Sequence, residues 1–362
     1  MKRFFEACIF GLTALFLIVT PVFFSACNKK EKVDPDQNDT LPPYKPTYVS
    51  LQIPEGFPIM EIPDDNPLTK EGIALGKKLF FDPILSGDST QSCADCHKPE
   101  HSFSDDRRFS LGITGAIGTR QAPPIINAGW MKKLFWDGRV SSLEEQALHP
   151  VENPDEMAAT WEEVVRRLQR HPVYPKLFYS AFGTTEITRY HVVKAIAQFE
   201  RTLISGNSRF DLALQGKVFF TPLEQDGYDL FYSERGDCFH CHSGLLFTDN
   251  AFHNNALDSV PTDLGLEKIT GKRSDRGKFK TPTLRNIEHT APYMHDGRFA
   301  SLEEVIDFYS EGLQYSPYAD PLMKALPQGG KHFTPYEKKA LLAFLKTLTD
   351  TSFLNNPDFL PE

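Results

Sequence analysis

Hydrophobic and polar residues are unevenly distributed along this chain, and the contrast is strongest at its start. Residues 7–24 form one apolar run that follows Lys2 and Arg3. The run is too short and wrongly flanked for a membrane span, whereas a basic start followed by an apolar stretch is typical of a secretory signal peptide. We therefore predict that residues 1–26 are a signal peptide.

The predicted signal peptide ends in Phe24-Ser25-Ala26, followed by Cys27. Small residues just before a cysteine resemble a bacterial lipobox, in which cleavage before Cys27 accompanies lipid attachment to its sulfur. A plain signal peptide and an uncleaved anchor are the alternatives. Residues 28–50 are polar and proline-rich, so we expect residues 27–55 to form a flexible tether.

Farther along the chain, apolar residues recur at helical spacing, and the alternation typical of strands is sparse. The periodicity predicts helices over residues 161–169, 191–203 and 336–347. Thr334 and Pro335 precede the last of these, and a threonine cap followed by proline in the first turn is a helix-start signal. The pattern therefore predicts an all-α protein.

Composition narrows the class of protein. The 362 residues are 40% hydrophobic and 24% charged, which is a globular composition, and this length favours two domains. The formal net charge is −9, so the surface would repel phosphate backbones, and nucleic acid is not expected as a partner. The 29 phenylalanines suit the burial of a large flat ligand.

The six cysteines carry the most informative pattern. Apart from Cys8 and Cys27, they form two C-x-x-C-H motifs, composed of Cys93, Cys96 and His97 and of Cys238, Cys241 and His242. In c-type haem attachment the two thiols bond the vinyl groups, and the adjacent histidine faces the iron. A four-cysteine zinc site, a redox dithiol and two disulfides compete, but zinc would not require histidine after both pairs. We expect two covalent haems.

The chain also contains an internal repeat with an offset of 159 residues. Trp136-Asp137-Gly138-Arg139 aligns with His295-Asp296-Gly297-Arg298, and each block leads into Ser-Leu-Glu-Glu. The serine can cap a helix whose first-turn glutamates complement the helix dipole. We expect two α-helical, cytochrome c-like domains with long loops, each enclosing one haem, over residues 56–210 and 211–362.

Together with the two haem motifs, the blocks Phe135-Trp136-Asp137-Gly138-Arg139 and Pro292-Tyr293-Met294-His295-Asp296-Gly297 resemble the bacterial di-haem cytochrome c peroxidase family. That family includes the MauG-like enzymes, and the resemblance covers roughly residues 60–350. It implies that the N-terminal haem, with His97 on its proximal side, meets peroxide. The C-terminal haem would handle electrons.

The resemblance also implies the peroxide-handling residues. The family's catalytic glutamate and distal glutamine correspond in register to Glu156 and Gln146. Such a glutamate moves a proton from one peroxide oxygen to the other. Many members have a distal histidine that blocks this haem, but the corresponding residues 111–115 contain none, so a five-coordinate haem is expected. His101 and His149 are the rival ligands.

For the second haem, the resemblance implies His242 as proximal ligand, but Tyr309 stands where the peroxidases have methionine. A tyrosine at this position is similar to the MauG-like branch, and a phenolate would stabilise the oxidised iron. A core tyrosine, or ligation by Met294 or Met323, is the alternative. Trp136 is expected to bridge the haems, with simple packing as its alternative role.

The family also places Ca²⁺ between its domains, and the matching positions are Gln121, Thr290 and Pro292. The leading interpretation is a lipid-anchored di-haem peroxidase of the periplasm or cell envelope. It would reduce hydrogen peroxide with electrons from a cytochrome c or similar donor. MauG-like oxidation of a protein or small-molecule partner and a non-catalytic electron carrier are the alternatives. The resemblance also allows a homodimer.

Overall fold

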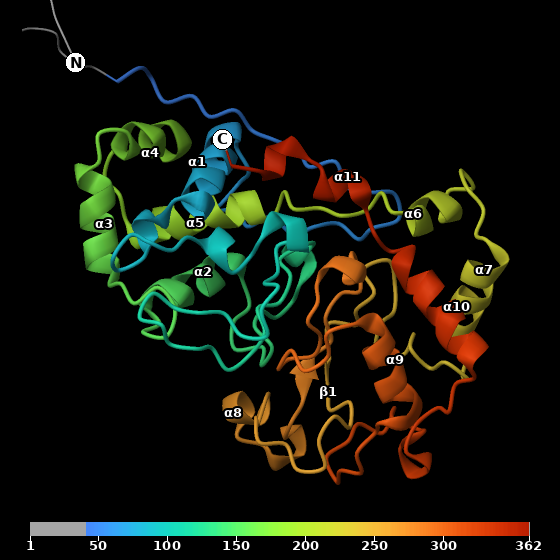
Figure 1. The fold of residues 1–362 in the computed structure, drawn as a ribbon. Coiled ribbons are helices and arrows are strands. Elements are labelled where there is room, and N and C mark those ends of the chain that lie inside the picture. The colour runs from blue at the N-terminus through green and yellow to red at the C-terminus, as the bar shows by residue number, and fades with distance from the viewer. Residues whose placement is uncertain (1–40, 362) are drawn as a thin grey trace, which may run out of the picture. The chain divides into compact units, whose positions relative to one another are not determined.

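Helices predominate in residues 41–361, the part of the chain that the computed structural model describes (Figure 1). The predicted signal peptide and Cys27 lie outside that part. One two-stranded antiparallel sheet, β1 (Phe252–His253) with β2 (Phe279–Lys280), is found there. The α-helices are α1 Lys70–Phe81, α2 Leu143–Glu152, α3 Trp161–Arg170, α4 Tyr174–Phe182, α5 Arg189–Glu200, α6 Arg209–Leu214, α7 Pro222–Phe231, α8 Glu267–Thr270, α9 Leu302–Glu311, α10 Pro335–Lys346 and α11 Thr351–Leu354.

None of the helices within residues 41–361 has both the length and the apolar character needed to cross a membrane.

The three helices predicted from periodicity are present with small shifts at their ends. They are α3, α5 and α10. At the start of α10, the Thr334 hydroxyl accepts a hydrogen bond from the Glu337 backbone N at 3.2 Å. The Glu337 carboxylate accepts one from the Thr334 N at 2.7 Å. The threonine cap was predicted from the sequence, and the structure adds the return bond to Glu337, so that two backbone donors are satisfied at the start of the helix.

The internal repeat is also present in the backbone. The first and last residues of 134–140 form an antiparallel bridge, and so do those of 293–299, at the same offset. Each bridge closes a loop that leads into a helix with a serine cap. Ser142 caps α2 and Ser301 caps α9, and each hydroxyl accepts from the backbone N three residues on, at 3.1 and 3.2 Å.

Each half is built around one close helix crossing. A Cβ on Gly76 of α1 would lie 1.9 Å from the Ala195 carbonyl oxygen of α5. A Cβ on Gly227 of α7 would lie 1.9 Å from the Ala340 carbonyl oxygen of α10. Only glycine permits backbones to approach so closely, so the same residue type serves the same purpose in both halves.

Two aromatic-rich cores lie beside these crossings. The first packs α1 to α5 around Phe80, Phe103 and Phe199, and the second packs α7, α9 and α10 around Phe210, Phe231, Phe247 and Phe344. Aromatic side chains bury a large area each, so these clusters contribute strongly to the packing of both cores.

The C-terminal segment crosses from the second half to the first. Phe353 of α11 and Phe359 belong to the first core, and the Phe353 ring lies 6.0 Å from that of Phe103. Figure 1 shows the red chain that runs from α10 through α11. Residues 44–361 belong to one compact unit. The division into two domains at residue 210 stays a prediction.

Candidate functional site

The first haem motif begins in a 3₁₀ turn, Cys93–Asp95, that the Ser92–Asp95 pair caps. The chain then turns so that Nδ1 of His97 lies 3.0 Å from the Phe103 carbonyl oxygen. A carbonyl can only accept, so Nδ1 carries the proton, and Nε2 keeps its lone pair for a metal. Burial also lowers the pKa of His97 and favours this neutral form.

The second motif repeats this arrangement. Nδ1 of His242 lies 3.0 Å from the Phe247 carbonyl oxygen, and burial lowers the pKa of His242. Metal-bound histidines commonly donate their second ring nitrogen in this manner. None of the four motif cysteines is in a disulfide. The donor set therefore fits covalent haem attachment at both motifs.

A large apolar cavity adjoins the second motif. Its empty volume, which includes space that opens to solvent, is about 1580 Å³. Apolar side chains supply much of the lining, as a flat macrocycle requires. The lining also includes Cys238, Cys241, His242, Tyr309, Trp136, Lys280 and His295.

Tyr309 projects from α9 into this cavity. Its hydroxyl accepts a hydrogen bond from the Asn255 amide at 3.3 Å, and burial raises its pKa to about 12. The alternative ligands Met294 and Met323 also line the cavity, and the Met294 sulfur lies 3.6 Å from the same amide. The fold thus brings Tyr309 and His242 to one cavity, while iron ligation by Tyr309 stays a prediction.

Two aromatic rings and a lysine form one side of the cavity. The His295 ring stacks on Phe279 with centroids 3.7 Å apart, and burial lowers the pKa of His295 to about 4. Burial lowers the pKa of Lys280 to about 8. Its ammonium lies 3.9 Å from the Met131 sulfur, and within residues 41–361 burial alone, with no carboxylate, accounts for the shift. An anionic group of a bound cofactor would suit this place.

The two halves meet through a pair of matching backbone hydrogen bonds. The Lys280 N donates to the Trp136 carbonyl at 2.9 Å, and the Gln121 N donates to the His295 carbonyl at 2.9 Å. Lys280 follows Gln121, and His295 follows Trp136, by the repeat offset of 159 residues. The contact is therefore related by pseudo-twofold symmetry, and it places Trp136 of the first half against the cavity of the second.

Trp136 is held firmly at this contact. Its side chain is 8% exposed, and its indole N–H donates to the Gln121 carbonyl at 2.8 Å. The Gln121 side chain in turn donates to the Ser104 hydroxyl at 2.7 Å, next to Phe103, whose carbonyl faces His97. Contacts thus lead from Trp136 to the loop that follows the first motif, and its ring borders the second cavity. Its role as a bridge between haems stays a prediction.

Glu156 follows α2 and is half-buried. Burial raises its pKa, although a 2.8 Å hydrogen bond from the Asn153 amide opposes that effect. The Glu156 carbonyl accepts from the Ile113 N at 2.9 Å. A Cβ on Gly112 would lie 2.2 Å from the Asp155 carbonyl oxygen, so the histidine-free loop packs directly on the glutamate's backbone.

Glu156 also lies near the first motif. Burial raises the pKa of the Cys96 thiol, and the Glu156 charge adds to that effect. Gln146 is half-buried on α2. The rival ligand His149 is exposed, with its ring 5.6 Å from that of Phe135, and His101 lies in a short 3₁₀ turn. The roles predicted for Glu156, Gln146, His149 and His101 stay predictions.

The residues matched to the family's Ca²⁺ site occupy the same junction. Gln121 and Thr290 are buried, at 3% and 5% exposure. The Gln121 backbone contacts His295, three residues from Pro292. The Gln121 amide nitrogen already donates to protein oxygens, and the Thr290 hydroxyl donates to Ile287. Calcium binding stays a prediction.

Sequence reasoning missed Lys280 and the phenylalanines that orient the histidines. Lys280 follows Gln121 by the repeat offset, so extending the repeat upstream would have found it. Phe103 and Phe247 could not be found from the sequence, because they act through their backbone carbonyls and not through their side chains. Their φ angles of 59° and 51° are likewise properties of the backbone.

A family model described as di-haem cytochrome c peroxidase matches residues 70–218. The chain is 41% identical over 290 residues to the methylamine utilization protein MauG of Methylorubrum extorquens, covering 79% of this chain and 80% of that one. It is 35% identical to the cytochrome c551 peroxidase of Nitrosomonas europaea, covering 83% and 86%. A crystal structure of a MauG-like protein associated with microbial copper homeostasis superposes with a TM-score of 0.81 at 38% identity, covering 86% and 99%.

Proposed function

Because the chain belongs to the di-haem cytochrome c peroxidase family, we propose that it carries two covalent haems, one in each half, and reduces hydrogen peroxide to water. The observation that carries this proposal is the matched pair of histidines, each of which donates Nδ1 to a phenylalanine carbonyl. The haems would supply a binding place for peroxide and a store for electrons. Cys93, Cys96 and His97 would hold the first haem, and Cys238, Cys241 and His242 would hold the second.

At the first site, Glu156 and Gln146 perform the proton chemistry. The Glu156 carboxylate takes a proton from one peroxide oxygen and delivers it to the other, which departs as water. The Gln146 amide orients peroxide by hydrogen bonding. The balanced reaction consumes one peroxide, two protons and two electrons and yields two waters. The raised pKa of Glu156 suits a group that must both accept and return a proton.

Tyr309 and His242 would hold the iron of the second haem, which would accept electrons from a cytochrome c or similar envelope protein. Trp136 would carry these electrons across the junction toward the first site, because its ring borders the second cavity and its indole donates to the Gln121 carbonyl. A calcium ion held by Gln121, Thr290 and Pro292 would stabilise this junction.

We also propose that the protein is exported and attached to the cell envelope by lipid on Cys27. The basic start, the apolar run and the small residues before Cys27 support this location. The acidic net charge of −9 would suit a donor with a basic surface.

The proposal is tested on protein matured with haem in a bacterial periplasm. After denaturation, the chain should retain two haems, and steady-state peroxide consumption should depend on reduced cytochrome c, with turnover within roughly 1–10³ s⁻¹. A colourless chain, or one that loses its haem on denaturation, would contradict covalent attachment. Coloured protein that leaves peroxide unconsumed would contradict the peroxidase assignment alone.

A second candidate function is MauG-like oxidation of a protein or small-molecule partner. Tyr309, in place of methionine beside the second cavity, favours it, because a phenolate ligand lowers the potential and disfavours uptake of electrons from a high-potential cytochrome. This candidate gains if peroxide changes the visible spectrum of the oxidised protein without prior reduction while no small cytochrome sustains turnover. Rapid turnover with such a cytochrome would exclude it.

A further inference from the structure

Both motif histidines depend on a strained carbonyl. Phe103 and Phe247, whose carbonyl oxygens accept from His97 and His242, have φ angles of 59° and 51°. A non-glycine residue in this left-handed region is strained and persists only where its surroundings hold it. Whatever fixes these two phenylalanines therefore also fixes the direction of the histidine hydrogen bonds.

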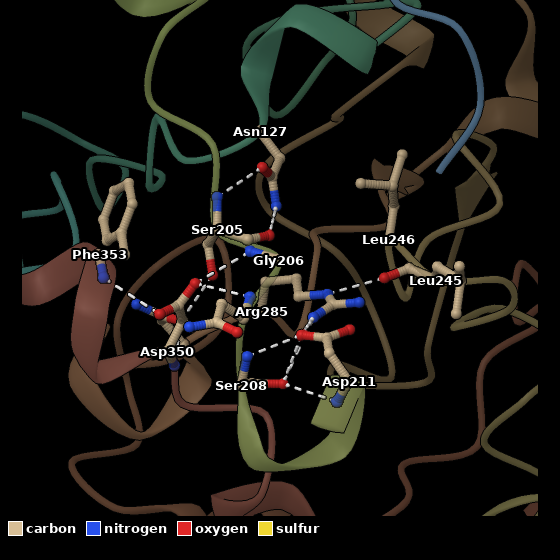
Figure 2. A network of polar contacts seen from close by, with 12 residues as sticks. Asn127, Ser205, Gly206, Ser208, Asp211, Leu245, Leu246, Arg285, Asp350 and Phe353 are labelled. Carbon is tan, nitrogen blue, oxygen red and sulfur yellow. Dashed lines mark hydrogen bonds and ion pairs between the residues drawn. The ribbon is translucent and has the colours of Figure 1, made fainter. Parts of the chain in front are cut away.

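The loop of Phe247 is held by Arg285 from the other side of the second core. Arg285 is fully buried, and its Nε donates to the Leu245 carbonyl at 2.7 Å. One terminal nitrogen pairs with the Asp211 carboxylate at 2.5 Å, and the guanidinium lies 5.5 Å from the Phe247 ring centroid. Figure 2 shows Arg285 between Asp211 and Leu245. The arginine thus holds the strained loop through both its backbone and its ring.

The next residue, Asn286, reaches the equivalent loop of the first half. It is fully buried, and its amide nitrogen donates to the Ser102 hydroxyl at 3.2 Å, directly before Phe103. Its amide oxygen accepts from the Ser205 hydroxyl and from the Asp350 N, both at 2.9 Å. Asn286 belongs to the second half but is bonded to the loop that orients the histidine of the first.

We propose that the dipeptide Arg285–Asn286 is a positioning element shared by the two haem sites. Asn286 acts on His97 through Ser102 and Phe103, and Arg285 acts on His242 through the loop of Phe247. The proposal rests on the two haem sites proposed above. It predicts that a residue of the second half controls the histidine hydrogen bond of the first.

The burial of this pair argues for a positional role. The second terminal nitrogen of Arg285 is buried and has no partner among residues 41–361. Burying a charge with one donor unsatisfied costs free energy that an apolar side chain would avoid. A fully buried polar network can, however, restrict neighbouring loops to one arrangement.

The internal repeat provides a matched control. Asn127 occupies the position of Asn286 in the first half, and its side chain both donates to and accepts from the Ser205 backbone, at 3.0 and 2.9 Å. It therefore contacts the same connecting segment, as Figure 2 shows, but its side chain has no hydrogen bond to Ser102. Asn127→Ala removes buried side-chain hydrogen bonds of the same kind but none to the loop of Phe103. It leaves in place the Ile125 backbone N, which donates to the Phe103 carbonyl at 3.2 Å.

The experiment compares Asn286→Ala, Ser102→Ala and Asn127→Ala in the haem-loaded protein. Loosening the Phe103 carbonyl weakens the hydrogen bond that makes the His97 imidazole electron-rich. The first haem's iron–histidine stretching band should therefore shift to lower frequency and its midpoint potential should rise, while the second haem's potential stays unchanged. Ser102→Ala deletes only one oxygen and should fold even if Asn286→Ala does not.

Two results would overturn the proposal. One is an unchanged first-haem band in Ser102→Ala and in folded Asn286→Ala. The other is an equal shift in Asn127→Ala, which would mean that any loosening of the connecting segment acts on the haem. Arg285→Lys completes the comparison and should shift the second haem's potential but not the first. Colourless protein would instead contradict the proposed haem sites.

Discussion

The two halves share a backbone plan and differ at the positions where chemistry would occur. In each, a glycine permits a close helix crossing, a serine caps the helix after the repeated loop, and the motif histidine donates to a phenylalanine carbonyl. On the repeat offset, Tyr309 of α9 corresponds to Pro150 of α2, which has no group able to ligate iron. Glu156 corresponds to Tyr315, which is 76% exposed.

A second difference lies inside the helix crossings. Ala195 and Phe199 of α5 face Gly76 in the same way that Ala340 and Phe344 of α10 face Gly227. This alignment of the two helices makes Leu345 of the second half the counterpart of Glu200 in the first. Glu200 is 4% exposed, and burial raises its pKa to about 8. The same backbone plan therefore accommodates Glu200 or Leu345 at one position and Pro150 or Tyr309 at another. The helix caps and the helix crossings stay the same in both halves.

The largest effect is expected at Glu156. Glu156→Gln keeps the hydrogen bond to Asn153 but removes the carboxylate, so steady-state peroxide turnover should fall at least about 100-fold. Haem content should be unchanged. The neighbouring exposed acid provides the control, and Asp155→Asn should retain turnover. Unchanged turnover in Glu156→Gln would assign proton transfer to another group.

The pH profile sharpens the same test. Burial raises the pKa of Glu156, so the carboxylate forms only above the ordinary range for glutamate. Turnover of the native protein should rise with pH through that raised pKa. The rising limb should be absent from the residual activity of Glu156→Gln, and a profile shared by both proteins would contradict the assignment.

Replacing Tyr309 tests the difference at the second site. Tyr309→Phe removes the proposed phenolate ligand and should change the visible spectrum and raise the midpoint potential of the second haem, with the first haem unaltered. The matched control is Tyr315→Phe on the exposed surface. Identical spectra for Tyr309→Phe and native protein would mean that the tyrosine only packs.

The glycine crossings should respond alike if the two halves are built alike. Gly76→Ala and Gly227→Ala each force a methyl group against a carbonyl oxygen, and each should lower the free energy of unfolding by about 1–3 kcal/mol or more. Guanidinium titration followed by circular dichroism measures the change. Gly118→Ala, with its nearest atom 3.5 Å away, should be nearly neutral. A large effect in only one half would break the comparison.

The last effect concerns the buried acid Glu200. Burial raises the pKa of Glu200 from 4.5 to about 8, so the folded state keeps a proton that the unfolded state loses. Between those values stability should fall with rising pH, by at most about 1.4 kcal/mol per pH unit. Glu200→Gln should remove this slope in melting temperatures from pH 5 to pH 8. The exposed Glu162→Gln should keep it.

Signals that span a few residues were recognised reliably in the sequence. The Thr334 cap, the serine caps of α2 and α9, and the three periodic helices were predicted and are present. The helical ends were off by up to three residues, because helix ends depend on packing as well as periodicity. The di-haem peroxidase family was likewise recognised from its short motifs.

Contacts between distant segments were not predictable in the same way. Nothing local indicated that Phe353 and Phe359 would pack into the first core, or that the Lys280 backbone would bond to Trp136. Likewise, nothing in the sequence around Arg285 and Asn286 indicates that these two polar residues are fully buried. Each depends on segments tens to hundreds of residues apart.

The two C-x-x-C-H motifs, the helix starts and the repeated blocks follow from the sequence alone, because each consists of side chains a few residues apart. The packed fold was needed to show that Tyr309 faces the same cavity as His242, that Trp136 borders it, and that the two halves exchange matching backbone hydrogen bonds. The physical reason is that burial and hydrogen-bond partners follow from how the whole chain packs. No local pattern specifies which distant carbonyl a buried donor will meet.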